Sequence, residues 1–130
     1  MKKFVLDTSA IFSLIESEAG KERVAQIIRE EEIIIPFVSL LELHYISWQE
    51  QGEEEANRRL AILKQKPILW QYDEALLSLA SHLKVHHRIS LADAMIAAVC
   101  IRHEAVLVHK DPEYESLAGI VEMEPLPYKV

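Results

Sequence analysis

The sequence has little cysteine and no long hydrophobic run. Its one cysteine, Cys100, cannot form a disulfide within the chain, and its apolar neighbours predict a buried thiol in a reducing compartment. The apolar residues near the start are interrupted at Asp7, too early for a signal peptide. No stretch reaches the roughly 18 apolar residues of a membrane span. We therefore expect a cytoplasmic protein without membrane contact.

Positive charge is also scarce, because 14 Lys and Arg stand against 21 Asp and Glu, giving a net charge of -7. This balance argues against a nucleic-acid partner, since phosphate binding normally needs a basic surface. Carboxylates that hold divalent cations weaken the objection, because the metal would then face the phosphate. Half of the 130 residues are apolar and 27% are charged, which predicts one folded domain over residues 1–130.

The apolar pattern predicts strands that alternate with helices. Strands are expected at residues 3–6, 33–36, 67–70 and 105–109, with a weaker one at 120–123. Helices are expected directly after Asp7 and over residues 21–31, 39–51, 53–66, 74–87 and 90–104. Such alternation predicts an α/β fold, a three-layer α/β/α sandwich with a central, mainly parallel sheet of four or five strands. Ligands of such sheets bind beyond the carboxyl ends of the strands.

Four carboxylates stand at the predicted element boundaries: Asp7, Glu42, Asp93 and Asp111. Each has a purely structural alternative. Asp7 and Asp111 could be helix N-caps, whereas Glu42 and Asp93 each follow a serine by three residues, as in a capping box. In a parallel sheet, however, all four would meet at one edge. They are therefore candidates for a shared site.

Burial favours a site over four separate caps. Asp93 lies among apolar residues from Leu91 to Val99, with no Lys or Arg one helical turn away. An unpaired buried carboxylate costs several kcal/mol. Close like charges repel by about 4 kcal/mol per pair even at an effective dielectric constant near 20. A bound divalent cation relieves both costs, and a set of oxygen ligands favours Mg²⁺ or Mn²⁺ over Zn²⁺.

Four segments carry a resemblance to a known family. They are residues 4–10 (FVLDTSA), 38–43 (VSLLEL), 90–98 (SLADAMIAA) and 107–114 (LVHKDPEY). The chain resembles the PIN-domain family, and within it the VapC toxins. The resemblance implies an Mg²⁺- or Mn²⁺-dependent endoribonuclease that hydrolyses RNA, an antitoxin partner and a homodimer. It implies that Asp7, Glu42, Asp93 and Asp111 are the catalytic and metal-binding residues.

The last of these segments departs from the family pattern. The family often has Thr or Ser at the position of His109 and an Asn-like residue at that of Lys110, whereas Glu113 and Tyr114 fit its usual acid and aromatic pair. The departure concerns hydrogen bonding around the acids more than metal binding.

Several other side chains are candidates for supporting roles. A hydroxyl of Thr8 or Ser9 could fix a carboxylate or a metal-bound water, although both could simply be helix-start hydroxyls. Glu113 is a marginal addition to the acids. The candidates for contacts with RNA phosphates are Arg58, Arg59, Lys64, Lys84, His87, Arg88 and Lys110. Trp48 and Trp70 could stack on bases, but packing in the core or in an interface is the stronger interpretation.

Other functions compete with this interpretation. His82 and His86 are four residues apart and could share a zinc ion, but the intervening glutamate of the metalloprotease motif is absent. A phosphatase with Asp7 as nucleophile needs a second acid at the position of Ser9. A PIN-like interaction module without catalysis and a free-standing RNA-processing nuclease are the remaining alternatives.

Overall fold

The structure of the chain, a computed structural model, describes residues 2–129. Its five strands are β1 (Lys3–Leu6), β2 (Glu32–Pro36), β3 (Ile68–Leu69), β4 (Val106–His109) and β5 (Met123–Pro125). They form one sheet in the order β3-β2-β1-β4-β5, and every neighbouring pair is parallel. The predicted parallel sheet is confirmed, with β1 at its centre.

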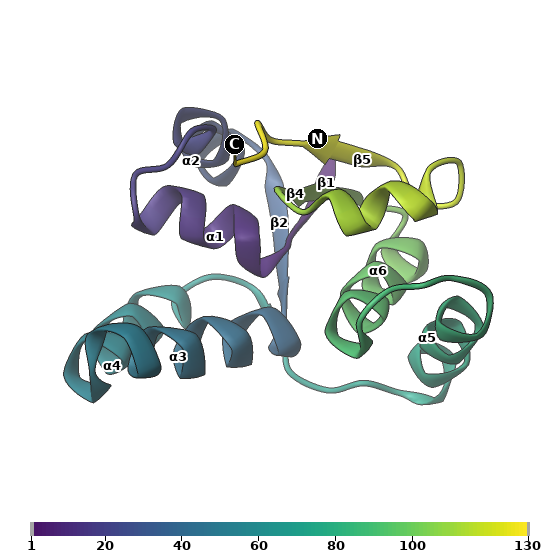
Figure 1. Cartoon of the computed structure of the whole chain (residues 1–130), viewed down its shortest axis with the longest axis horizontal. Coiled ribbons are helices and arrows are strands. Elements are labelled where there is room, and N and C mark those ends of the chain that lie inside the picture. Colours follow the sequence, from purple (N-terminus) through teal and green to yellow (C-terminus); the bar gives the residue numbers. More distant parts are fainter. Residues whose placement is uncertain (1, 130) are drawn as a thin grey trace.

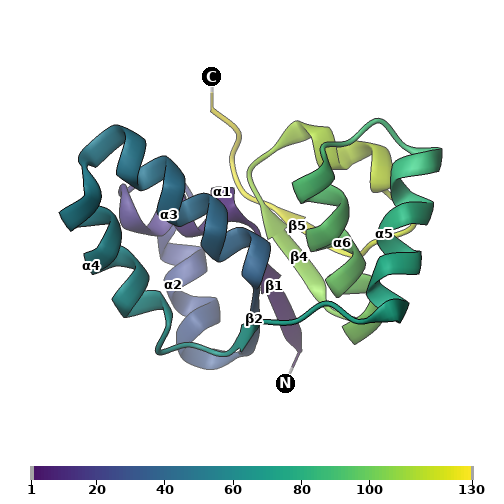
Figure 2. The same cartoon turned by 90° about the horizontal axis from the view of Figure 1, so that it is seen from below.

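Helices cover both faces of this sheet. They are α1 (Thr8–Ile15), α2 (Lys21–Glu30), α3 (Phe37–Gln51), α4 (Glu53–Leu63), α5 (Glu74–His86) and α6 (Leu91–His103), followed by the short 3-10 helix η1 (Pro112–Leu117). Figures 1 and 2 show α1 to α4 on one side of the sheet and α5 and α6 on the other. The predicted three-layer α/β/α sandwich is confirmed. Among residues 2–129, no helix has the length and apolarity needed to span a membrane.

Several boundaries differ from the predicted ones by one to three residues, and two of the differences have a local reason. Helix α3 begins at Phe37 instead of residue 39, because the hydroxyl of Ser39 donates to the carbonyl of Leu6 and does not cap the helix. The last strand begins at Met123 instead of residue 120. The amides of Ile120 and Val121 donate to the carbonyl of Leu117, so this segment turns before it can join the sheet.

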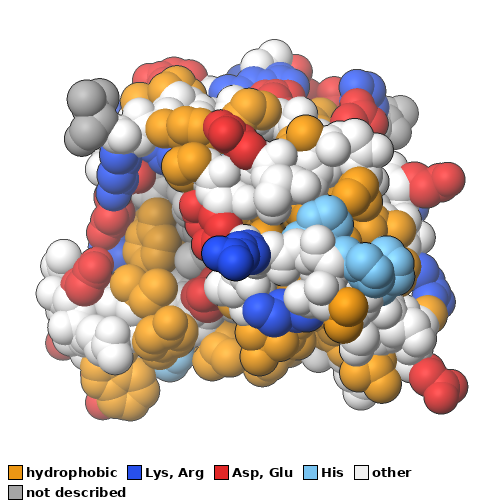
Figure 3. Space-filling view, turned by 45° about the vertical axis from the view of Figure 1, so that its right-hand side comes forward, with side chains coloured by type: hydrophobic (Ala, Val, Ile, Leu, Met, Phe, Trp, Pro, Cys, Tyr) orange, Lys and Arg blue, Asp and Glu red, His pale blue; other side chains and the backbone are white. Residues whose placement is uncertain are grey.

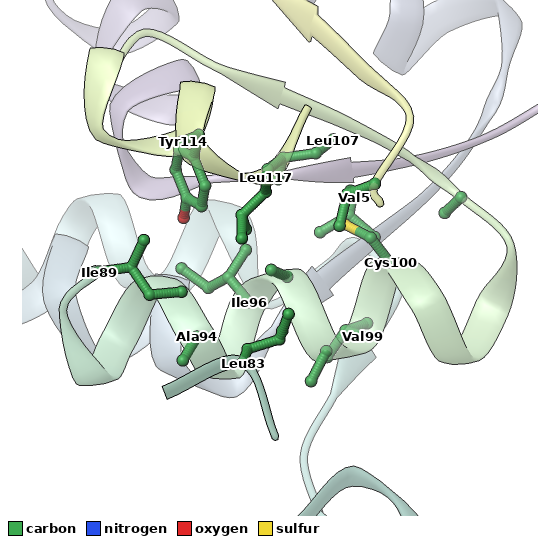
Figure 4. Packing of buried hydrophobic residues seen from close by; sticks show 14 of the residues in the cluster. Val5, Leu83, Ile89, Ala94, Ile96, Val99, Cys100, Leu107, Tyr114 and Leu117 are labelled. Atoms are coloured by element: carbon green, nitrogen blue, oxygen red, sulfur yellow. The ribbon is translucent and has the colours of Figure 1, made fainter. Parts of the chain in front are cut away.

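The two faces of the sheet have separate hydrophobic cores. One core contains Val5 and Leu107 of the sheet together with α5, α6 and η1, and it includes the buried Cys100. The small residues Ala94 and Ala97 of α6 are fully buried there, which allows the helix backbone to approach the sheet closely. Figure 4 shows η1 above α6 in this core. The start of α6 is thereby fixed beside the ends of β1 and β4.

Helix α5 offers a test of this packing. Leu83 is 2% exposed and contacts the core, whereas Ile62 of α4 is 49% exposed. We expect Leu83→Ala to lower the free energy of unfolding by about 2–5 kcal/mol, because it leaves a cavity, and Ile62→Ala by less than about 1 kcal/mol. Urea denaturation of both variants measures the difference. Equal losses in the free energy of unfolding would contradict the buried position of Leu83.

Candidate active site at the carboxyl end of the sheet

Asp7 leaves the end of the central strand and begins the site. It caps α1, and its Oδ2 accepts hydrogen bonds from the amide of Ser9, at 3.0 Å, and from the Ser9 hydroxyl. The N-cap alternative is therefore correct for this residue, but only one carboxylate oxygen serves it. Asp7 is 4% exposed, so its charge lies in a nearly dry environment.

Glu42 reaches the site from α3. The bond from Ser39 to the carbonyl of Leu6 ties the first turn of α3 to the end of β1, and Glu42 follows in the next turn. The hydroxyl of Thr8 donates to Glu42 Oε1 at 2.7 Å. Burial raises the pKa of Glu42, and the negative charges of Asp7 and Asp111 add to the effect. This carboxyl group therefore holds a proton more readily than a solvated glutamate does.

Asp93 enters from the first turn of α6. Ser90 caps this helix by accepting the amide hydrogen of Asp93, at 3.1 Å, whereas the amide of Ser90 donates to Glu113 Oε1 at 2.6 Å. The capping-box pattern is thus completed by Glu113, and the carboxylate of Asp93 remains available to the site. Asp93 is 7% exposed, and burial together with the charge of Asp7 raises its pKa to about 7.

Tyr114 joins the two most buried carboxylates. Its hydroxyl lies 2.7 Å from Asp7 Oδ1 and 3.0 Å from Asp93 Oδ1. A phenol has one hydrogen to donate, so it can satisfy only one of these oxygens at a time. The oxygen that does not receive this hydrogen is free to face a cation. In the sequence, Tyr114 is recognisable only as part of the family pattern, and no role could be predicted for it.

The segment after β4 supplies the remaining acids. Asp111 caps η1 by accepting the amide hydrogen of Glu113 at 2.9 Å. The amide of Asp111 itself donates to His109 Nδ1 at 3.1 Å. Burial lowers the pKa of His109, which keeps the ring neutral and able to accept. His109, which departs from the family pattern, therefore holds the backbone amide of Asp111.

These residues surround one open hollow of about 290 Å³ at the carboxyl edge of the sheet. It is lined by Asp7, Thr8, Ser9, Phe12, Glu42, Ile46, Ser90, Asp93, Asp111 and Glu113. Figure 3 shows acidic side chains gathered in a hollow near the centre of one face, beside cationic ones. The structure thus brings together all four acids singled out in the sequence, and the marginal candidate Glu113 with them.

The donor set fits a hard divalent cation. Carboxylate oxygens of Asp93, Asp111 and Glu113 lie within 4.8 Å of one another. The groups around them are carboxylates and hydroxyls, the oxygen ligands that Mg²⁺ and Mn²⁺ prefer. His82 and His86 instead stack on each other, and His86 Nδ1 lies 2.9 Å from the carbonyl of His82. No His, Cys or acid completes a metal-binding group with them within residues 2–129.

Most of the candidate phosphate-binding cations are occupied elsewhere. Arg58 and Arg59 both bind Glu55, and Arg59 is buried between α1, α3 and α4. Lys110 is buried against Glu18. Lys84 donates to the carbonyl of Ile89. Arg88 is exposed, two residues before Ser90, and forms no ion pair within the described part of the chain.

Comparison with known proteins agrees with this architecture. The model of the PIN domain family matches residues 4–120. The chain belongs to the PIN domain family. No curated protein matches it. The resemblance stated from the sequence is thereby confirmed at the level of the family.

Several solved structures similar to this PIN domain belong to toxin-antitoxin systems. A chain of Rickettsia felis VapBC2, in a complex with promoter DNA, is 17% identical with a TM-score of 0.79, and the match covers 96% of this chain and 99% of that one. A chain of Haemophilus influenzae VapBC-1 is 21% identical with a TM-score of 0.74, and the match covers 95% of this chain and 97% of that one. Mycobacterium tuberculosis VapC20, described as a toxin that cleaves the sarcin-ricin loop, is 20% identical with a TM-score of 0.72. The match covers 94% of this chain and 99% of that one. At these identities the likeness shows a shared fold.

The raised pKa of Asp93 gives a pH-dependent prediction for the metal-free PIN domain. An acid whose pKa is higher in the folded than in the unfolded state binds more protons when folded, so the protein loses stability as pH rises from about 4 to about 7. Asparagine at position 93 cannot ionise, so a variant that carries it does not show this loss of stability with rising pH. In EDTA, the stability of Asp93→Asn relative to wild type should therefore rise by about 1–3 kcal/mol between pH 5 and pH 8.

Urea denaturation of both proteins at the two pH values measures this change. The matched control is Asp73→Asn, because Asp73 is the exposed N-cap of α5 and asparagine caps a helix about as well as aspartate. A stability difference between Asp93→Asn and wild type that stays constant with pH would show that Asp93 ionises freely in the fold.

Proposed function

We propose that this PIN domain protein is a divalent-metal-dependent endoribonuclease that hydrolyses RNA phosphodiester bonds. One observation carries the proposal: Asp7 and Asp93, both buried, face a single hydroxyl hydrogen, with three further carboxylates around the same hollow. Tyr114 has one hydrogen for the two buried carboxylates, so hydrogen bonds within the chain leave part of this charge unbalanced. A cation held at the hollow would balance it and would face an RNA phosphate.

Asp93, Asp111 and Glu113 would hold the metal, and Asp7, which shares the Tyr114 hydroxyl with Asp93, would be a further ligand. Mg²⁺ or Mn²⁺ in such a site supplies an activated water and neutralises the charge that develops on the phosphate. The chain's own hydrogen bonds fix the ligands, because Ser9 orients Asp7 and His109 holds the amide of Asp111. Such supporting bonds set ligand orientation and metal affinity.

Glu42 has a separate role in this proposal. It lines the hollow from α3, and its pKa is raised by burial and by the charges of Asp7 and Asp111. A carboxylate with a raised pKa accepts a proton at neutral pH more readily than a solvated one. We infer that Glu42 orients the attacking water and accepts its proton, with the hydroxyl of Thr8 holding Oε1 in place.

We further propose that the protein is the toxin of a toxin-antitoxin pair. Chains with this fold occur in the VapBC complexes described above. Leu41, Tyr45 and Trp48 of α3 are 44–47% exposed and follow each other at helical spacing, on the same helix as Glu42. This apolar stripe would suit an antitoxin segment that also covers the acidic hollow. A free-standing RNA-processing nuclease has the same site but needs no such partner.

The homodimer implied by the family is also a proposal, and α5 offers a surface for it. Leu77 and Val85 are 65% and 78% exposed and lie two turns apart on one face of the helix. A pair of such faces can bury apolar surface symmetrically.

RNA cleavage tests the catalytic proposal directly. Purified wild type should cleave single-stranded RNA only when Mg²⁺ or Mn²⁺ is present. Asp7→Asn and Asp93→Asn should each lower kcat by a factor of about 100 or more, because each removes a charge placed to bind the metal. The control Asp73→Asn lies outside the hollow and should keep wild-type activity. Equal cleavage by all four proteins would identify a contaminating nuclease and contradict the proposal.

Expression in a bacterial host separates a toxin from a free-standing nuclease. Wild type should arrest growth, and Asp93→Asn at equal expression should not. RNA cleavage in vitro without growth arrest would favour the RNA-processing alternative.

The oligomeric state is tested with Val85→Asp. Light scattering should show wild type as a dimer and the variant as a monomer, because a buried unpaired charge in the interface costs several kcal/mol. A matched change on α3, Trp48→Asp, should leave the dimer intact. A monomeric wild type would contradict the homodimer.

A further inference from the structure

Lys110 is a buried lysine with no direct role in the proposed chemistry. Its side chain is 4% exposed. The Nζ atom donates to the carbonyl oxygen of Ala19 at 2.9 Å and lies 3.5 Å from Glu18 Oε1. A buried ammonium group loses several kcal/mol of hydration. An apolar side chain would fill the same space without that cost. The presence of a lysine at this buried position therefore needs an explanation.

The bonds of Lys110 join two segments that are distant in the chain. Glu18 and Ala19 lie in the turn between α1 and α2, whereas Lys110 stands between the end of β4 and Asp111. The backbone amide of Lys110 donates to the hydroxyl of Ser9 at 2.8 Å, and that hydroxyl in turn donates to Asp7. Lys110 therefore contacts the groups that support two of the acids, through its backbone on one side and its side chain on the other.

Asp111 needs such support because β4 ends at His109 and the buried residues of η1, Tyr114 and Leu117, come only after it. Asp111 is only half-buried and Glu113 is exposed, and both lie close to Asp93, whose charge repels theirs. Without restraint, the segment could relieve this repulsion by moving Asp111 outward into water. The bond from the amide of Asp111 to His109 restrains the backbone locally. The side chain of Lys110 fixes the same segment to the body of the protein.

We propose that Lys110 is a positioning residue, whose ion pair with Glu18 and hydrogen bond to Ala19 hold Asp111 at the metal-binding distance from Asp93. This inference rests on the proposed metal-dependent function. Glu18 also contacts the exposed Lys129 through its other oxygen, at 2.9 Å from Oε2, so its contact with Lys110 does not require Lys129. The buried contacts of Lys110 with Glu18 and Ala19 are here called the clamp.

The variant Lys110→Met tests the clamp, with Mn²⁺ affinity as the main readout. Simple Coulomb attraction predicts that removal of a positive charge near an acidic hollow strengthens cation binding. Loss of positioning predicts the opposite. We expect Lys110→Met to bind Mn²⁺ about 10-fold more weakly and to cleave RNA with a kcat lower by about 10-fold, as for other groups that orient metal ligands. The KM for RNA should not change.

Lys129→Met is the matched control, because Lys129 contacts the same Glu18 but is 71% exposed and leaves the bond between Lys110 and Glu18 in place. It should bind Mn²⁺ at least as tightly as wild type does. Titration calorimetry measures the affinities, and circular dichroism with thermal melting shows whether each variant is folded. Should Lys110→Met not fold, Glu18→Gln decides instead, with an expected loss of Mn²⁺ affinity of a few-fold.

The outcomes distinguish this proposal from the function on which it rests. If wild type binds no Mn²⁺, the metal-dependent function fails and the clamp fails with it. If wild type binds Mn²⁺ and a folded Lys110→Met binds it equally or more tightly, the function stands and the clamp alone is wrong. A lower melting temperature with unchanged affinity would likewise show that Lys110 serves only to stabilise the fold.

Discussion

The hydroxyl of Tyr114, placed between the carboxylates of Asp7 and Asp93, is the contact on which the site depends. It lies within hydrogen-bonding distance of both acids but has one hydrogen to give. Each carboxylate leaves a different layer of the fold, since Asp7 ends the central strand and Asp93 lies in the first turn of α6. Bringing them to one hydroxyl requires α6 to pack closely on the sheet. The small buried residues of that helix make this approach possible.

This arrangement explains how a protein with a net charge of -7 can be proposed to act on RNA. Part of the excess negative charge is concentrated at the carboxyl end of the sheet, around one hollow. Elsewhere, acids such as Glu55 and Glu124 are paired with arginines. A divalent cation in the hollow would change the sign that an approaching phosphate meets. The surface charge of the whole chain is therefore a poor guide to the charge at the site.

The layers of the fold and the grouping of the four acids could both be predicted, because both follow from local sequence signals. Apolar runs that end at Asp7 and near Asp111, with helical spacing after them, are local signals, and parallel topology then brings the ends together. Tyr114 and Lys110 could not be assigned in this way. Their roles depend on contacts with residues 21 to 107 positions away, and no local pattern encodes such contacts. The contact of Glu113 with the amide of Ser90 could not be predicted either, because it joins two separate elements.

The capping alternatives show why local explanations and a site at the sheet edge are compatible. Asp7 and Asp111 do cap helices, and each uses one carboxylate oxygen to do so. A carboxylate has two oxygens, so the cap fixes the orientation of the group while the second oxygen remains free for another partner. At Asp7 that second oxygen faces Tyr114. The hydrogen bonds that begin α1 and η1 therefore also preorganise the acids, and the site needs little rearrangement to accept a cation.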